Sequence, residues 1–209
     1  MSAPEELAAN QAANQAANWE KTFTATTADQ THAFGARLAE VLQAGDLLVL
    51  SGELGAGKTT FTQGLGEGLG VRAGIISPTF VLVRIHPNLP DGPRPGGPDL
   101  VHVDAYRLGS AAEIDDIDLE NTMDSSVTVV EWGHERVEHL SDSRLEIDLL
   151  RAIGLGAPGS GAGGGTLDFD GEDTDEPRTI VMRGYGPRWA SAPELGQPDL
   201  GAPGGDVPC

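Results

Sequence analysis

Residues 52–60 read GELGAGKTT and follow the apolar run Leu47-Leu48-Val49-Leu50. The stretch fits the pattern G-x-x-x-x-G-K-[ST], in which glycines let successive backbone N–H groups turn inward around phosphate groups. The apolar run has the length and composition of a buried strand. The sequence therefore predicts a phosphate-binding loop between a strand over 47–51 and a helix over 60–69, whose N-terminus points at the phosphates.

Two residues of this loop carry the expected chemistry. The Lys58 ammonium supplies a point charge to the β and γ oxygens, and the Thr59 hydroxyl ligates Mg²⁺. Lysine is scarce in this chain, with only Lys21 and Lys58 against eleven arginines. A compact, flexible ammonium suits a phosphate loop better than a planar guanidinium. The loop therefore predicts a site for a nucleoside triphosphate and Mg²⁺.

Composition excludes several classes of function. The net charge is −19, from 32 acidic and 13 basic residues, which argues against a broad surface for RNA or DNA. The single cysteine, Cys209, rules out an internal disulfide or a thiolate metal cluster. The N-terminal residues lack the pattern of a secretory signal, and no apolar run approaches membrane-spanning length. We expect a cytoplasmic protein without a membrane partner.

The chain divides into one predicted domain with irregular additions. Residues 1–18 are low in complexity and are expected to be disordered, as is a tail over 191–209 that is rich in Pro and Gly. The single domain covers 19–190. Within it, a connection over 86–99 and a glycine-rich, acidic insertion over 154–177 are expected to be irregular loops.

Periodicity predicts alternating helices and strands. Thr27-x-x-Gln30 resembles a capping box, and Phe34, Leu38, Val41 and Leu42 then share a helical face until Gly45. Ser110-x-x-Glu113 predicts a second, short acidic helix. Further strands are expected at 80–85, 100–103, 127–130, 144–150 and 179–182.

Two of these strands end in an acid. Asp104 follows Leu100-Val101-His102-Val103, and Glu131 follows Val127-Thr128-Val129-Val130. Ligands of open α/β sheets bind at the carboxyl ends of strands, and a triphosphate site needs a carboxylate that positions Mg²⁺ or water. An edge-strand charge is the competing interpretation. We favour function clearly for Glu131 and more narrowly for Asp104.

Neighbouring residues have two interpretations each. Ser77-Pro78-Thr79-Phe80 has the composition of a loop that reaches a metal or the γ-phosphate, or of an ordinary proline turn. Trp132 either stacks at the nucleotide or packs in the core. Arg107 either stabilises charge or pairs with a nearby acid. His102 and His134 are interpreted as incidental, because no second ligand stands at metal spacing.

Four motifs in order carry a family resemblance. GELGAGKTT, SPTF, VDAYRL and VEW, over roughly residues 20–150, resemble the TsaE (YjeE) family, the ATPase component of bacterial tRNA threonylcarbamoyladenosine synthesis. The resemblance implies an α/β, phosphate-loop NTPase-like fold of three layers around a mixed, mainly parallel sheet. It also implies a slow, Mg²⁺-dependent ATPase stimulated by TsaD- and TsaB-like partners, with tRNA contacted only through that complex.

The resemblance assigns roles to residues of this chain. It implies that Thr59 and Glu131 ligate Mg²⁺, that Asp104 is a Walker-B-like acid and that Trp132 matches the tryptophan of the family's EW pair. Ser77 and Thr79 would belong to a switch. The residues that would hold the phosphates are Gly55, Ala56, Gly57, Lys58, Thr59 and Thr60.

Other functions remain in competition. A small metabolite or nucleotide kinase typically carries an arginine-rich lid, whereas the arginines here are scattered. A regulatory GTPase needs a lysine in N-K-x-D that this chain lacks. A nucleotide-dependent clamp that barely hydrolyses ATP also fits, because positioning of Mg²⁺ alone would require Asp104 and Glu131.

Overall fold

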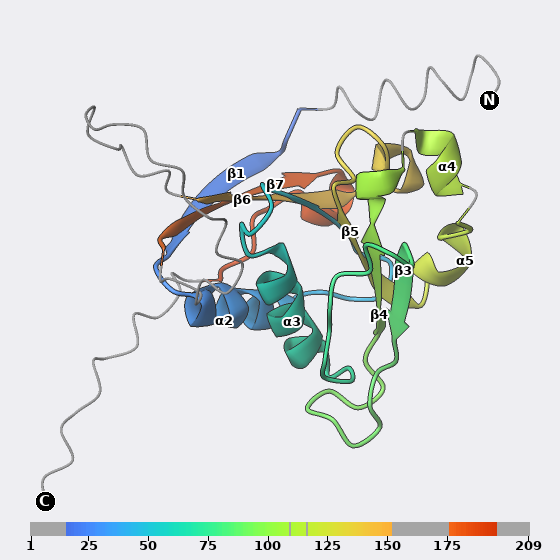
Figure 1. Ribbon diagram of the computed structural model, residues 1–209, viewed down its shortest axis with the longest axis horizontal. Helices are drawn as coiled ribbons and strands as arrows, with labels where there is room; N and C mark the ends of the chain where they lie inside the picture. The colour runs from blue at the N-terminus through green and yellow to red at the C-terminus, as the bar shows by residue number, and fades with distance from the viewer. Residues whose placement is uncertain (1–15, 109, 116, 152–175, 196–209) are drawn as a thin grey trace, which may run out of the picture.

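The order of the strands places the phosphate loop at the centre of the sheet. The computed structural model describes residues 16–108, 110–115, 117–151 and 176–195, and its sheet has seven strands in the order β1-β7-β6-β2-β5-β4-β3 (Figure 1). Parallel pairing joins β6, β2, β5 and β4, whereas β3 and the β7–β1 pair add antiparallel edges. The predicted mixed sheet is confirmed, with its parallel part confined to the centre. The strands are β1 (Trp19–Ala25), β2 (Leu47–Ser51), β3 (Val83–His86), β4 (Asp99–Asp104), β5 (Ser126–Glu131), β6 (Arg144–Arg151) and β7 (Arg178–Tyr185).

Helices cover both faces of this sheet, which gives three layers. On one face α2 and α3 lie side by side, and α4 and α5 lie on the other (Figure 1). Each face has its own apolar cluster, the first containing Phe34 and Phe61 and the second Ile114 and Leu119. The α-helices are α2 (Ala28–Ala39), α3 (Lys58–Leu69), α4 (Ala111–Asp115) and α5 (Glu120–Met123). Short 3₁₀ turns are η1 (Ala105–Arg107), η2 (Glu138–Leu140) and η3 (Pro187–Trp189).

Glycine lets α2 and α3 approach each other closely. A Cβ atom on Gly35 of α2 would collide with the backbone oxygen of Phe61, and one on Gly64 of α3 would collide with that of His32. Helix interiors lose stability when they contain glycine, so close packing has to offset that cost. The contact fixes α3, and with it the phosphate loop, against the neighbouring helix.

The predicted first helix is confirmed, but it is shorter than expected. Thr27 caps it through its Oγ1 atom, which accepts from the Gln30 N–H at 3.1 Å. The helix ends at Ala39, so Val41 and Leu42 follow it in a turn. Leu42 is buried, whereas Val41 is 38% exposed and does not belong to the core face. The backbone turn after the last helical residue breaks the 3.6-residue period there.

Most predicted strands are present within a residue or two of their expected bounds. The sequence did not identify β1, whose seven residues carry mainly exposed side chains and turn only Phe23 and Ala25 into the core. An edge strand with one buried end gives a weak alternation signal.

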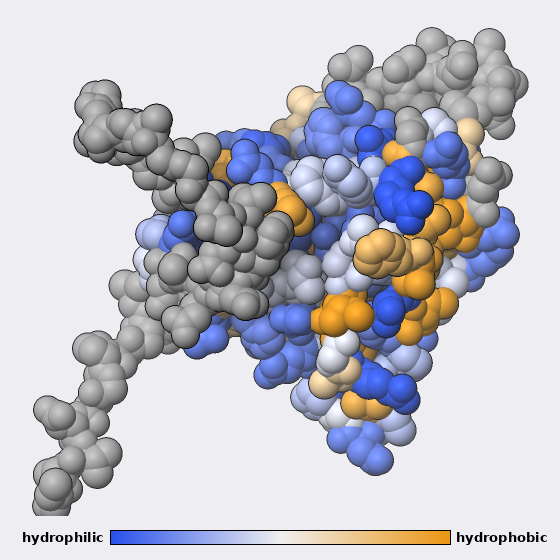
Figure 2. Space-filling model, viewed as in Figure 1, coloured by the Kyte–Doolittle hydropathy of each residue, from blue (hydrophilic) through white to orange (hydrophobic). Residues whose placement is uncertain are grey.

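The expected strand over 80–85 is wrong in its first half. β3 begins only at Val83, because the N–H groups of Val81 and Leu82 both donate to the Pro78 carbonyl and form a turn. Leu82 adopts a φ of +66°, which ends any extended pairing. Phe80 is consequently 90% exposed, and apolar surface gathers over β3 in the space-filling view (Figure 2).

The irregular connection over 86–99 has a structural task that its composition did not reveal. The Arg94 guanidinium donates to the carbonyls of Ala39 and Leu42, each at 2.9 Å. The Asn88 side-chain amide donates to the Leu69 carbonyl at 2.8 Å. These side chains satisfy carbonyls that the ends of α2 and α3 leave without helical partners.

The predicted terminal and inserted segments fall mostly outside the described residues. This holds for residues 1–15 of the N-terminal extension, for 154–175 of the insertion and for 196–209 of the tail. Leu195 is 8% exposed and belongs to the core, so packing continues into the stretch where the tail was expected. Among the described helices, each is too short or too polar to cross a bilayer.

Candidate nucleotide site

The phosphate loop connects the end of β2 to the start of α3. Gly55 and Gly57 have φ angles of +78° and +99°, a region that residues with a Cβ rarely adopt. Gly57 is the N-cap of α3, so the first N–H groups of that helix face the loop. The helix dipole and these free donors together favour an anion at this point.

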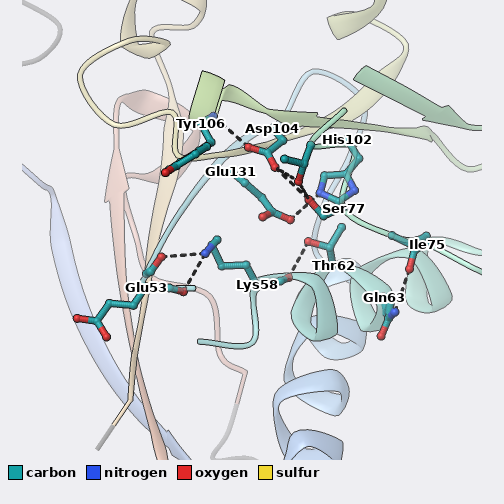
Figure 3. Close-up of polar contacts among 12 residues, drawn as sticks. Glu53, Lys58, Thr62, Gln63, Ile75, Ser77, His102, Asp104, Tyr106 and Glu131 are labelled. Atoms are coloured by element: carbon teal, nitrogen blue, oxygen red, sulfur yellow. Dashed lines mark hydrogen bonds and ion pairs between the residues drawn. The ribbon is translucent and has the colours of Figure 1, made fainter. Parts of the chain in front are cut away.

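Lys58 lies folded back against its own loop (Figure 3). Its Nζ atom donates to the carbonyls of Gly52 at 2.8 Å and Glu53 at 3.1 Å, and it lies 4.1 Å from the centroid of the Trp132 ring. Burial lowers the pKa of Lys58, and the negative charges of Glu131 and Asp104 partly oppose that shift. The ammonium is therefore held at the mouth of the loop by weak acceptors and one aromatic face.

Asp104 gathers the residues of the predicted switch around its carboxylate. Its Oδ2 atom accepts from the hydroxyls of Ser77 at 3.0 Å and Thr79 at 2.7 Å. Its Oδ1 atom accepts from the Tyr106 N–H at 3.0 Å. The side chain is only 3% exposed. The structure thus joins Asp104 to the turn that carries Ser77 and Thr79, which lie far from it in the sequence.

Glu131 stands beside Asp104 at the same edge of the sheet. The two are register partners of the parallel strands β4 and β5, so both carboxylates project from the carboxyl ends of neighbouring strands. The Oε1 atom of Glu131 lies 2.8 Å from Nε2 of His102, which is fully buried. His102 was interpreted as incidental, and the structure corrects this. A signal was present, because His102 and Asp104 are two residues apart on one strand and share its face.

Trp132 is held in a strained conformation over the lysine. Its φ is +61°, although its N–H still donates to the Leu50 carbonyl at 2.9 Å. The Tyr106 ring meets it edge-on, with 5.4 Å between centroids. A bulky residue in the left-handed region costs on the order of 1–3 kcal/mol and persists where surrounding contacts enforce it. Trp132 is therefore a side chain at the cavity rather than a core residue.

These groups surround one cavity of about 520 Å³, a size within the range of small-molecule sites. Its donor set fits Mg²⁺, since the Thr59 hydroxyl and the Asp104 and Glu131 carboxylates, which are hard oxygen ligands, all belong to residues that line it. Ala56 belongs to the loop but is fully buried beneath it. The cavity is lined by Leu54, Gly55, Gly57, Lys58, Thr59, Thr60, Ser77, Thr79, Asp104, Tyr106, Glu131, Trp132 and Arg178.

The spacing of residues in the sequence did not predict one cluster of possible metal ligands outside this cavity. The ligand atoms of His134, Glu138 and Glu146 lie within 4.8 Å of one another. Both Glu138 oxygens accept backbone N–H groups, and Glu146 accepts from the Arg144 Nε at 2.9 Å. The two carboxylates thus have structural partners already, so the group does not itself indicate a metal centre.

A glycine-rich loop, a helix N-terminus and two strand-end acids define a phosphate-loop nucleotide-binding protein of the α/β class. The model of the family TsaE, described as threonylcarbamoyl adenosine biosynthesis protein TsaE, matches residues 25–153. The chain belongs to the TsaE family of threonylcarbamoyl adenosine biosynthesis proteins.

Curated relatives and a solved structure agree with this assignment. A tRNA threonylcarbamoyladenosine biosynthesis protein TsaE of Streptomyces coelicolor is 50% identical over 159 residues, covering 76% of this chain and 93% of the relative. The TsaE of Mycobacterium tuberculosis is 45% identical over 136 residues, covering 62% and 79%. The crystal structure of Bacillus subtilis YdiB superposes with a TM-score of 0.55 at 28% identity, covering 80% of this chain and 87% of that one.

Proposed function

We propose that this chain is the Mg²⁺-dependent ATP hydrolase of tRNA threonylcarbamoyladenosine synthesis. One observation carries the proposal: Lys58, Asp104 and Glu131 meet around a single cavity at the end of a phosphate loop. The relatives named above give the process, since their names state tRNA threonylcarbamoyladenosine biosynthesis. The hydrolysis itself is argued from the site.

The residues of the site would have different roles in hydrolysis. Lys58 would exchange the carbonyls of Gly52 and Glu53 for the β and γ oxygens, which are stronger, charged acceptors. Thr59 and Glu131 would hold Mg²⁺, which neutralises charge on the phosphates when it is bound. His102 fixes the orientation of Glu131 through a hydrogen bond at 2.8 Å.

The turn over 77–79 would report the nucleotide state. Asp104 binds both hydroxyls of the turn through one oxygen, Oδ2. A ligand that draws on Asp104 would compete with those bonds and release the turn, which would couple the order of this segment to the state of the site. Phe80 lies in the adjoining turn that the Pro78 carbonyl closes and is 90% exposed, and its neighbours Ile76 and Val81 are 53% and 54% exposed. Exposed apolar side chains gathered beside such a switch support a site for a protein partner.

We further propose that the partners are TsaD- and TsaB-like subunits and that the protein acts in the cytoplasm. The net charge of −19 supports contact with tRNA through these subunits rather than directly. ATP hydrolysis here would support turnover of the threonylcarbamoyl transfer that the partners perform.

The test is ATP hydrolysis by the full chain, alone and with its TsaD and TsaB counterparts, beside a Glu131→Ala variant. We expect partner-stimulated turnover that the substitution removes. Strong turnover without partners, or phosphate transfer to a small acceptor in place of water, would contradict the proposal and indicate a kinase. ATP binding with no turnover in either condition would indicate a nucleotide-dependent clamp.

A further inference from the structure

Arg178 is a buried basic residue in the nucleotide cavity that neither the motifs nor the family resemblance identified. It opens β7, is 6% exposed and lines the cavity together with the phosphate loop. One of its terminal nitrogens donates to the Glu176 carbonyl at 2.7 Å. Its Nε atom is buried and has no hydrogen-bond partner within the described part of the chain.

The other arginines of the β6–β7 hairpin differ from it. Arg144 pairs with Glu146, Arg151 with Glu176, and Arg183 with both Glu20 and Asp148. Among the described residues, no carboxylate is found in an ion pair with Arg178. A guanidinium stays charged at any accessible pH, and a buried charge without an anionic partner is costly. Arg178 is therefore suited to receive an anion from outside the protein.

Arg178 lies directly beside the phosphate loop. A Cβ atom placed on Gly57 would lie 3.3 Å from the Arg178 Nε and 3.5 Å from its Cδ. The guanidinium therefore lies directly against the glycine that precedes Lys58 and caps α3. A side chain here would be strained by the φ of +99° and would also press on Arg178.

The sheet order determines which end of a nucleotide lies near Arg178. The acids stand on β4 and β5, to one side of β2, whereas Arg178 stands on β7 to the other side. The metal of phosphate-loop enzymes bridges the β and γ oxygens, so Asp104 and Glu131 mark the γ end. The opposite end of the phosphate chain then lies toward β6 and β7.

We propose that Arg178 binds the nucleoside end of the nucleotide, by donating from its guanidinium to the α-phosphate. This rests on the proposed function, because it needs a nucleotide in the phosphate loop. The bond would give the Arg178 Nε–H an acceptor and would form with ATP and ADP alike, since both carry an α-phosphate. It would not require Mg²⁺.

The test is a titration of the full chain with fluorescent ADP and ATP analogues, in Mg²⁺ and in EDTA. For Arg178→Gln we expect the Kd of both analogues to rise by about tenfold in both buffers, as befits one lost charge-assisted bond. The matched control is Arg183→Gln, which removes the same charge from the same strand beyond the cavity. Its Kd values should stay within about twofold of those of the parent chain.

Three results would overturn the inference. These are unchanged binding by Arg178→Gln, a loss confined to ATP, and an equal loss in Arg183→Gln. If Arg178→Gln does not give the circular dichroism spectrum of the parent chain, Arg178→Lys replaces it. Lysine keeps the charge but lacks the Nε–H, so we still expect weaker binding of both analogues, and unchanged binding would overturn the inference.

A Lys58→Ala arm separates this inference from the proposed function. If Lys58→Ala loses binding while Arg178→Gln does not, only the role of Arg178 falls. If the parent chain binds neither analogue, or Lys58→Ala binds both normally, the proposed nucleotide function falls with it.

Discussion

The two sides of the phosphate loop are prepared in opposite ways. On the β5–β4 side, Asp104 and Glu131 are buried acids whose oxygens already accept hydrogen bonds from Ser77, Thr79 and His102. On the β6–β7 side, Arg178 is a buried base whose Nε finds no partner in the described residues. Both sides line the same cavity.

The acidic side is already held in one orientation, whereas the basic side has a donor that still lacks an acceptor among the described residues. Carboxylates that hold a metal act through geometry, and their hydrogen bonds fix that geometry in advance. A guanidinium N–H without an acceptor forms its hydrogen bond to phosphate only when the ligand binds. The acidic side should therefore decide Mg²⁺ dependence and turnover, and the basic side should decide nucleotide affinity.

The largest effect is expected where the two sides meet, at Lys58. Lys58→Ala should weaken the binding of ATP by roughly 100-fold or more, because charge-assisted bonds to the β and γ oxygens are lost, and that of ADP by less, because only the β contact is lost. Titration calorimetry measures this. The matched control is Lys21→Ala, the chain's other lysine, which is exposed on β1 and should leave the Kd unchanged. Equal Kd values for the two variants would show that the Lys58 ammonium does not bind the phosphates.

Glu131→Gln tests the acidic side alone. Turnover with partners should fall by about 100-fold, since an amide cannot supply the negative charge that a metal ligand needs. The Kd of ADP in EDTA should stay close to that of the parent chain. Glu67→Gln is the control, because Glu67 lies exposed on α3 with its side chain 71% accessible. An unchanged rate in Glu131→Gln would remove Glu131 from the metal site.

His102→Leu tests whether Glu131 is oriented before Mg²⁺ binds. Without the 2.8 Å hydrogen bond to Glu131, the Mg²⁺ concentration for half-maximal turnover should rise by about tenfold. His102→Gln keeps a donor near the Nε2 position and should recover much of that loss. Nucleotide affinity in EDTA is the second readout and should change in neither variant. If both variants shift by the same amount, His102 acts in packing only.

The smallest effect concerns pH and the stability of the acidic side. Burial, followed by the neighbouring charges of His102 and Arg84, lowers the pKa of His86 below its ordinary value of 6.5. The His86 imidazole therefore binds a proton more readily in the unfolded chain than in the folded one. Its contribution to the free energy of unfolding is present above pH 6.5 and is lost as the pH falls toward the lowered pKa. Urea unfolding at pH 7.5 and 5.5 should show a loss in the parent chain that His86→Gln lacks, on the order of 1 kcal/mol or less. Equal losses would exclude His86 as the cause.

Much of this arrangement follows from local sequence, because its signals are local. The phosphate loop, β2, β4 and β5 were predictable, since each is a short apolar run followed by a distinctive polar residue. The pairing of Asp104 with Ser77 and Thr79 was beyond reach, because it depends on a turn that bends toward β4.

Other parts of the site escaped for physical reasons. The role of Arg178 depends on β7 lying beside β6. The local sequence of this eight-residue strand, which is far from the loop, does not predict that pairing. The close contact of α2 with α3 depends on Gly35 and Gly64, which propensity alone counts against a helix. The edge strand β1 carries too little buried surface to show its period.

One crossed titration tests most directly whether the two sides of the loop have separate tasks. The Kd of a non-hydrolysable ATP analogue is measured in Mg²⁺ and in EDTA for the parent chain, Glu131→Gln and Arg178→Gln. We predict that Glu131→Gln weakens binding only in Mg²⁺ and that Arg178→Gln weakens it by the same factor in both buffers. If the two variants respond to Mg²⁺ in the same way, the two sides of the loop do not have separate tasks and the account is wrong.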